Sequence, residues 1–175
     1  STPEGSFSSI ENTTPSSSLI RNAIFGSFQD YIVAPVGFGC TTNCGTISYY
    51  TIGTAPFRKT IINFNGLNYF NCTGLDARKA YFQLVLSETT NEIDVNVQDK
   101  PLPCLGNSSA NGNGNSLIGL NNADGTIGVA APGRNTSEFA VTNESYKFTP
   151  SGASATTVVW TNQFKKDYKL AMKCH

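Results

Sequence analysis

Few residues in this sequence could carry out acid–base or nucleophilic chemistry. The only histidine is the last residue, His175, and no Gly-x-Ser-x-Gly motif occurs, so a Ser–His–Asp or Cys–His mechanism has no well-placed base. Glu88, Glu92 and Asp94 lie near one another in the sequence. On a strand, Glu92 and Asp94 would share a face about 7 Å apart, as a glycosidase pair could, but an ordinary charged strand face is favoured. We therefore expect a protein that is not an enzyme.

Two turns could hold a ligand. The segment Asn121–Thr126 resembles a calcium loop, but it has one carboxylate, Asp124, where such loops have several. A hairpin turn with Gly125 in the left-handed conformation is favoured, and we expect no metal and no cofactor. Arg134, in the predicted turn Pro132–Asn135, could present its guanidinium to a glycan or carboxylate, or could hold its own loop through neighbouring carbonyl groups.

The five cysteines favour disulfide bonds over a zinc site, because no pair has the Cys-x-x-Cys spacing. Disulfides indicate an oxidising compartment. Cys72 and Cys104 flank a predicted hairpin that brings its two ends together, so we predict that they are bonded. Cys40 and Cys44 are separated by three residues, which is enough for a bridge between them. Cys174 remains, and it could pair outside the chain or compete for Cys40 or Cys44.

Length and composition favour one soluble all-β domain. The chain has 175 residues, enough for one core, and 39% of them are hydrophobic, including 11 Phe and 7 Tyr. Only 14% are charged, and 12 basic residues balance 12 acidic ones, which argues against nucleic acid as a partner. No run of 18 apolar residues occurs, so the sequence predicts no membrane-spanning helix.

The hydrophobic pattern predicts about ten short strands. In Glu92–Gln98, apolar and polar residues alternate as in a half-buried strand, and the polar link Glu88–Asn91 predicts a hairpin with Lys79–Ser87. A second hairpin joins Ser116–Asn121 to Gly125–Ala131. The other predicted strands lie in Asn22–Val33, Gly45–Gly53, Phe57–Asn65, Glu138–Pro150, Ser154–Asn162 and Tyr168–Met172.

These strands predict an all-β fold, an antiparallel β-sandwich or jelly-roll-like domain. We expect residues 22–175 to form this single domain. Residues 1–21, rich in Ser, Thr and Pro, are expected to be a linker or an edge-strand segment.

Three runs carry a resemblance to a known family: Ile52–Cys72, Gln83–Cys104 and Ile118–Pro150. In this order they resemble a module of large secreted Bacteroidetes surface proteins, such as gliding-motility adhesins and other cargo of the type IX secretion system. The resemblance covers Ile24–Trp160. It implies an extracellular, non-catalytic β-sandwich strung among other domains, and it supplies no binding residues.

Two functions agree with these observations. The first is an adhesion or structural module, at the cell surface or secreted, which contacts neighbouring domains or subunits of a large assembly. The alternative is a lectin-like domain, in which exposed aromatic residues among Tyr31, Tyr49, Tyr50, Tyr69 and Trp160 form a shallow platform for a glycan; core packing is the competing role of each. The candidate contact residues are Tyr49, Tyr50, Arg134 and Trp160.

Overall fold

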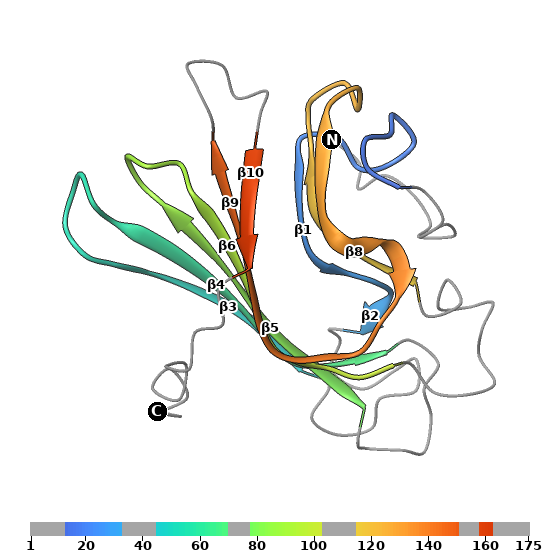
Figure 1. Cartoon of the computed structure of the whole chain (residues 1–175). Helices are drawn as coiled ribbons and strands as arrows, with labels where there is room; N and C mark the ends of the chain where they lie inside the picture. The colour runs from blue at the N-terminus through green and yellow to red at the C-terminus, as the bar shows by residue number, and fades with distance from the viewer. Residues whose placement is uncertain (1–12, 33–44, 70–77, 103–114, 151–157, 163–175) are drawn as a thin grey trace.

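The computed structural model describes residues 13–32, 45–69, 78–102, 115–150 and 158–162. This part of the chain contains strands and no helix, and every strand pair is antiparallel. Two sheets of unequal size face each other (Figure 1). The predicted all-β antiparallel sandwich is therefore confirmed.

The larger sheet consists mainly of five long strands that are neighbours in space. Their spatial order is β9 (Val141–Pro150), β6 (Ile93–Lys100), β5 (Lys79–Ser87), β4 (Lys59–Tyr69) and β3 (Thr46–Ile52). The short strand β10 (Val158–Asn162) lies beyond β9 at one edge. At the other edge, the two-residue strand β2 (Tyr31–Ile32) pairs with the end of β4 that β3 does not reach. Strands β2 and β3 thus share one edge of this sheet.

The smaller sheet contains β1 (Ala23–Phe28), β7 (Asn115–Asn121) and β8 (Gly128–Glu138), with β7 in the centre. The turn predicted at Pro132–Asn135 lies inside β8, so this prediction was wrong. Gly133 and Thr136 have positive φ angles of 68° and 56°, and the register between β7 and β8 shifts twice nearby. These residues therefore distort a continuous strand instead of ending it.

Both predicted hairpins are present. Strands β5 and β6 are joined at Ser87, whose N–H donates to the carbonyl of Glu92 at 2.9 Å. Strands β7 and β8 are joined by the turn that contains Gly125, which has a φ of 76°. Such an angle is in the left-handed region that glycine adopts without steric cost, as the sequence predicted.

The core lies between the two sheets. Val95 and Val97 of β6 point into it, because alternate side chains of a strand point to the same face, and they meet Ile118 of the smaller sheet. Twelve buried residues form this core: Leu67, Ala80, Phe82, Leu84, Val95, Val97, Ile118, Ala131, Phe139, Val141, Tyr146 and Phe148. The alternation predicted for Ile93, Val95 and Val97 is observed, but Asp94 and Asn96 on the other face are buried as well, so the expectation of a half-buried strand was wrong.

Residues 13–22 cross the outer face of the smaller sheet without forming a strand. Thr14 is buried there, and its hydroxyl donates to the carbonyl of Leu120 at 2.7 Å. Leu19 packs with Phe25 and Leu117 in a second apolar cluster. The described part of the predicted linker therefore belongs to the packed domain, which begins before the boundary expected at Asn22.

Candidate functional site

Strand β3 is exposed along its whole length. Four of its seven residues are large and apolar, and Tyr49 is the most exposed of them at 80%. Ile47 and Tyr49 lie opposite Phe64 and Ile62 of β4, on the face toward the core, whereas Tyr50 points to the opposite face. Because isolated apolar side chains are common on surfaces but a continuous apolar strand is not, β3 is a candidate interaction surface.

The outer edge of β3 is open to another strand. All seven residues of β3 pair with β4 in a regular register, from Thr46 opposite Asn65 to Ile52 opposite Lys59. In the described part of the chain, no strand lies against its other side. The sequence of β3, TISYYTI, contains no charge and no proline. An edge strand of this kind presents backbone N–H and C=O groups that can bind an added strand.

A cleft opens beside β3, between the two sheets. Its volume is about 350 Å³, and Ile47 of β3 lies in its wall. The rest of the wall is mostly apolar and comes from β1, β2, β4, β5 and the link between β1 and β2, with Phe64, Phe82 and Leu84 among the lining residues. Asp30 lies at the same cleft, where burial raises the pKa of its carboxyl. The exposed face of β3 is therefore continuous with an apolar cavity.

The tyrosines proposed for a glycan platform occupy two different environments. Tyr69 is fully buried, and its ring centroid lies 5.1 Å from that of Tyr31, which also packs against Phe82. Tyr31 and Tyr69 are thus parts of the core. Tyr49 and Tyr50 are exposed on β3, but their rings point to opposite faces of the sheet.

Trp160 lies far from these residues within the larger sheet. It belongs to β10, where its backbone pairs with Phe148, at the edge opposite β3. Its side chain lies outside the described part of the structure. The sheet therefore separates Trp160 from Tyr49 and Tyr50 by the strands β9, β6, β5 and β4, so the predicted contact residues do not form a single platform.

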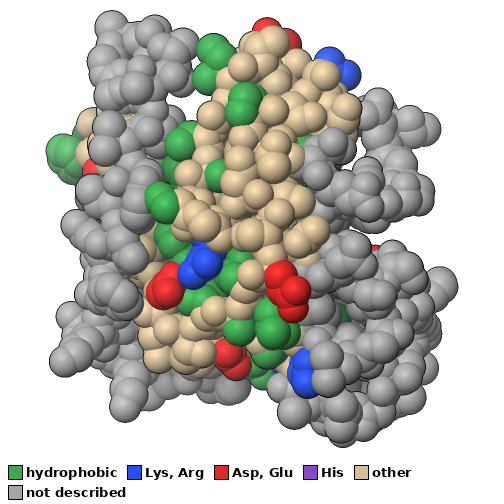
Figure 2. Space-filling view, turned by 45° about the vertical axis from the view of Figure 1, so that its right-hand side comes forward, with side chains coloured by type: hydrophobic (Ala, Val, Ile, Leu, Met, Phe, Trp, Pro, Cys, Tyr) green, Lys and Arg blue, Asp and Glu red, His purple; other side chains and the backbone are tan. Residues whose placement is uncertain are grey.

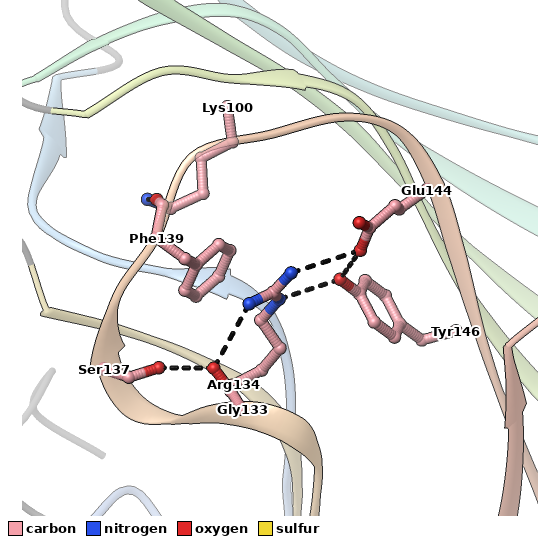
Figure 3. A network of polar contacts seen from close by, with 7 residues as sticks. All are labelled: Lys100, Gly133, Arg134, Ser137, Phe139, Glu144 and Tyr146. Atoms are coloured by element: carbon pink, nitrogen blue, oxygen red, sulfur yellow. Dashed lines mark hydrogen bonds and ion pairs between the residues drawn. The ribbon is translucent and has the colours of Figure 1, made fainter.

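Arg134 is half-buried and is held by a polar network (Figure 3). Its Nε donates to the hydroxyl of Tyr146 at 2.9 Å, its Nη2 lies 3.3 Å from Oε2 of Glu144, and its Nη1 donates to the carbonyl of Gly133 at 3.3 Å. The Tyr146 hydroxyl in turn donates to Glu144. Burial is the main reason that the pKa of Tyr146 rises to about 12, so this hydroxyl stays protonated. Of the two roles considered for Arg134, the geometry matches the one that fixes local structure.

A buried lysine adjoins this network. Lys100 has no exposed surface, its Nζ donates to the carbonyl of Phe139 at 2.8 Å, and it lies 4.3 Å from the centroid of the Phe139 ring. The guanidinium of Arg134 lies at the same distance from that ring. Burial, assisted by the positive charge of Arg134, lowers the pKa of Lys100 to about 7. Two cations thus contact one aromatic ring, and one of them can lose its charge near neutral pH.

The acidic residues considered for catalysis have basic partners. Glu92 and Asp94 lie 3.3 Å and 3.8 Å from Nζ of Lys147, which joins them on the outer face of the larger sheet. Glu88 forms two side-chain hydrogen bonds with Arg58, and these bonds lower the pKa of its carboxyl to about 2. Glu92 and Asp94 thus form ion pairs at the start of β6, where Asp94 is buried, and Glu88 forms one just after the end of β5.

The turn considered for calcium is closed by its own hydrogen bonds. One carboxylate oxygen of Asp124 accepts from both the N–H and the hydroxyl of Thr126, at 3.0 Å and 2.6 Å, and these bonds lower its pKa. The side-chain oxygen of Asn122 accepts from the N–H of Ile127 at 3.0 Å. The arrangement is that of an Asp–Gly hairpin turn.

The predicted disulfide residues, Cys40, Cys44, Cys72 and Cys104, lie outside the described residues, as does Cys174. Sequence reasoning also missed two features that the structure shows. For β3, the strand and the contact residues Tyr49 and Tyr50 were predicted, but its place at a sheet edge was not, because no local pattern specifies which strands are neighbours. For Lys100 there was none, because a lysine at the end of an alternating strand is normally exposed.

Charged side chains are sparse over the described part of the surface shown in Figure 2, in keeping with the low charge of the sequence. Among the described residues, no helix has the length and hydropathy needed to cross a membrane. No curated protein and no solved structure matches this chain.

One family does match. The family described as NIDO related matches residues 2–162, a span that includes all ten strands. A NIDO-related domain indicates an extracellular module of a larger protein. This agrees with the extracellular location that the resemblance implied. Because the match covers most of the sequence, the chain belongs to the NIDO-related family.

Proposed function

We propose that this chain is a non-catalytic adhesion or structural module, and that it contacts a neighbouring protein of an extracellular assembly through the exposed edge of β3. The observation that carries the proposal is the strand itself: seven exposed residues, four of them large and apolar, with no charge. Free strand edges bind extended segments through backbone hydrogen bonds, and alternate side chains add specificity.

The electrostatics of the chain support this kind of contact. Its formal net charge is zero, so long-range attraction to an anionic polymer or surface is weak. The contact must then depend on packing and on hydrogen bonds between neutral groups. Strand β3 supplies both, since Ile47 and Tyr49 are exposed on one face and Tyr50 and Ile52 on the other.

We also propose that the assembly belongs to a bacterial surface, as cargo of a type IX secretion system. The support is the resemblance of Ile52–Cys72, Gln83–Cys104 and Ile118–Pro150 to modules of Bacteroidetes surface proteins. The sequence of the whole gene product tests this part of the proposal. A type IX sorting domain at its end is the expected result, and a chain without any secretion signal would contradict it.

A pair of lysine substitutions tests the adhesive role of β3. Tyr49→Lys places a charge in the centre of the strand, whereas Ile127→Lys places one at an exposed apolar residue of the β7–β8 turn, on the other sheet. Each variant is introduced into the full-length protein in its own cell, and adhesion and retention of the protein in the extracellular assembly are measured. We expect that Tyr49→Lys abolishes adhesion and retention and that Ile127→Lys leaves both unchanged. Equal behaviour of the two variants would overturn the proposal.

The lectin-like alternative is favoured by one observation, the exposure of two aromatic side chains near one another in sequence. Tyr49 is 80% exposed, and Phe57, in the turn that follows β3, is 71% exposed. Exposed aromatic rings can stack on sugars. A glycan array distinguishes the two functions: saturable binding to a defined glycan that disappears in both Tyr49→Ala and Phe57→Ala would favour the lectin.

A further inference from the structure

We propose that the partner bound at the β3 edge is a second copy of this chain, and that the two β3 strands pair in antiparallel orientation about a two-fold axis at Tyr49. This inference rests on the proposed function, because it names the partner of the same edge. It goes further by fixing the symmetry of the contact and its register.

The symmetry of β3 in the chain favours this register. Tyr49 is the central residue of Thr46–Ile52, and glycines flank the strand at equal distances, Gly45 and Gly53, both with a φ of 83°. In an antiparallel pair, residues that lie opposite each other point to the same face of the sheet. An axis at Tyr49 fulfils this condition and lets all seven residues of each copy pair.

The residues brought opposite one another in this register are compatible. Tyr49 faces Tyr49 of the second copy, and the remaining pairs are Ser48 with Tyr50, Ile47 with Thr51, and Thr46 with Ile52. No pair places two charges opposite each other. Aromatic and β-branched residues favour the pairing of neighbouring strands. A lysine or a glutamate at position 49 would lie opposite the same charge in the second copy, and one at any other position would lose hydration opposite a neutral residue.

Strand β3 also lacks the features that normally prevent such pairing. Natural edge strands are protected by charged side chains, proline, bulges or short length. In the smaller sheet, the edge strand β8 contains Pro132 and the positive-φ residue Thr136, and the register of β1 shifts between Phe25 and Phe28. Strand β3 has a regular register over its whole length. Strand β10, at the other edge of the larger sheet, also has a regular register but pairs over five residues, so β3 is the longest regular edge among the described strands.

Within the described residues, β4 is the only strand that pairs with β3, so the outer edge of β3 can accept a second copy. In Figure 1 the hairpin that joins β3 to β4 extends away from the smaller sheet. A second β3 strand would extend the larger sheet and would place its own Tyr49 diagonally across from Ile47, at the mouth of the apolar cleft. The contact buries the exposed side chains of both copies, and it is closed, because each copy uses its single β3 edge once.

Two double variants test the register. In Ser48→Lys/Tyr50→Glu, the lysine of each copy lies opposite the glutamate of the other copy, which gives two ion pairs per dimer. In Ser48→Lys/Tyr50→Lys, the lysine at position 48 of each copy lies opposite the lysine at position 50 of the other copy. Dissociation constants are measured for the full chain by sedimentation equilibrium, after circular dichroism has shown that both variants keep the fold. We expect a dimer for the wild type and for the Lys/Glu variant, and an association at least about tenfold weaker for the Lys/Lys variant.

Two outcomes would overturn the inference: a wild-type chain that stays monomeric at all concentrations, or two double variants that dissociate equally. Either result is separate from the test of the proposed function. If the wild type is monomeric but Tyr49→Lys still abolishes retention in the assembly, β3 binds a different protein, and only the second copy is excluded. Ile127→Lys serves as the control variant and should dimerise as the wild type does.

Discussion

Individual charged residues in this protein are placed to hold the fold together. Arg134 binds Tyr146 and Glu144, and Lys147 binds Glu92. Lys100 differs from them, because its buried amine contacts a carbonyl group and aromatic rings and makes no ion pair among the described contacts. A lysine in such surroundings favours its neutral form. The protonation of one residue is therefore linked to the stability of the whole domain.

We predict that the domain becomes more stable as the pH rises from about 7 to about 9. The pKa of Lys100 is about 7 in the folded chain and returns to its ordinary value of 10.5 on unfolding, so the unfolded state binds more protons in this range. Raising the pH then favours the folded state, by on the order of 2 kcal/mol. Urea unfolding at the two pH values measures this change.

Lys100→Met is the matched variant for this measurement. It keeps a long side chain and removes the titrating group, so its free energy of unfolding should change little between the two pH values. If wild type and variant respond to pH in the same way, Lys100 is not the group responsible.

At the scale of the elements, the segment 13–22 is held to the smaller sheet by a reciprocal pair of hydrogen bonds. The N–H of Thr14 donates to Oδ1 of Asn135 at 2.8 Å, and Nδ2 of Asn135 donates to the carbonyl of Thr14 at 3.0 Å. Asn121 adds bonds from its Nδ2 to the carbonyls of Ser16 and Ile20. Two asparagine side chains thus replace a strand ladder along this segment.

Asn135→Asp should destabilise the domain by about 1–3 kcal/mol. The substitution keeps the size of the side chain but replaces the donor to Thr14 by a carboxylate oxygen, which repels the carbonyl. Asn65→Asp is the control, because Asn65 is exposed, has no positive φ and should tolerate the same change within about 0.5 kcal/mol. The midpoints of urea unfolding of the two variants are compared. Equal midpoints would show that the two hydrogen bonds between Thr14 and Asn135 contribute nothing to the stability of the domain.

The ends of strands β4 and β6 support the predicted disulfide between Cys72 and Cys104. The hydroxyl of Tyr69, at the end of β4, donates to the carbonyl of Pro101, just after β6. Tyr69 and Pro101 are thus in contact across β5, which lies between β4 and β6, and Cys72 and Cys104 each follow three residues later in the sequence. We expect peptide mapping without reduction to find this bond, which should stabilise the fold by roughly 3 to 4 kcal/mol. Free thiols at both positions would contradict it.

The sequence predicted those parts of the fold that local patterns specify. The alternation in Glu92–Gln98 and the turn at Gly125 are encoded by neighbouring residues, and both were found. The shape of β8 was not predicted, because Pro132 and Gly133 resemble a turn while pairing with β7 continues beyond them. The position of β3 at an edge depends on which strands are neighbours in the sheet, and no local pattern specifies that.

At the scale of the molecule, the two sheets differ in how their edges are protected. The smaller sheet has irregular edge strands, and residues 13–22 cover its outer face. The larger sheet ends at β3 in a regular, uncharged strand beside an apolar cleft. With a net charge of zero, the whole chain also adds little long-range repulsion between two copies. Association through β3 should therefore depend on apolar contact and backbone hydrogen bonds.

This leads to a prediction about salt. Between about 0.05 M and about 0.5 M sodium chloride, the dissociation constant of the wild-type dimer should change less than about threefold, because screening acts only on charges and β3 has none. The Ser48→Lys/Tyr50→Glu variant is the internal control. Its contact depends on cross-strand ion pairs, so the same increase in salt should weaken it several-fold. A wild-type dimer that dissociates as steeply with salt as this variant would show that charged residues outside β3 hold the two copies together.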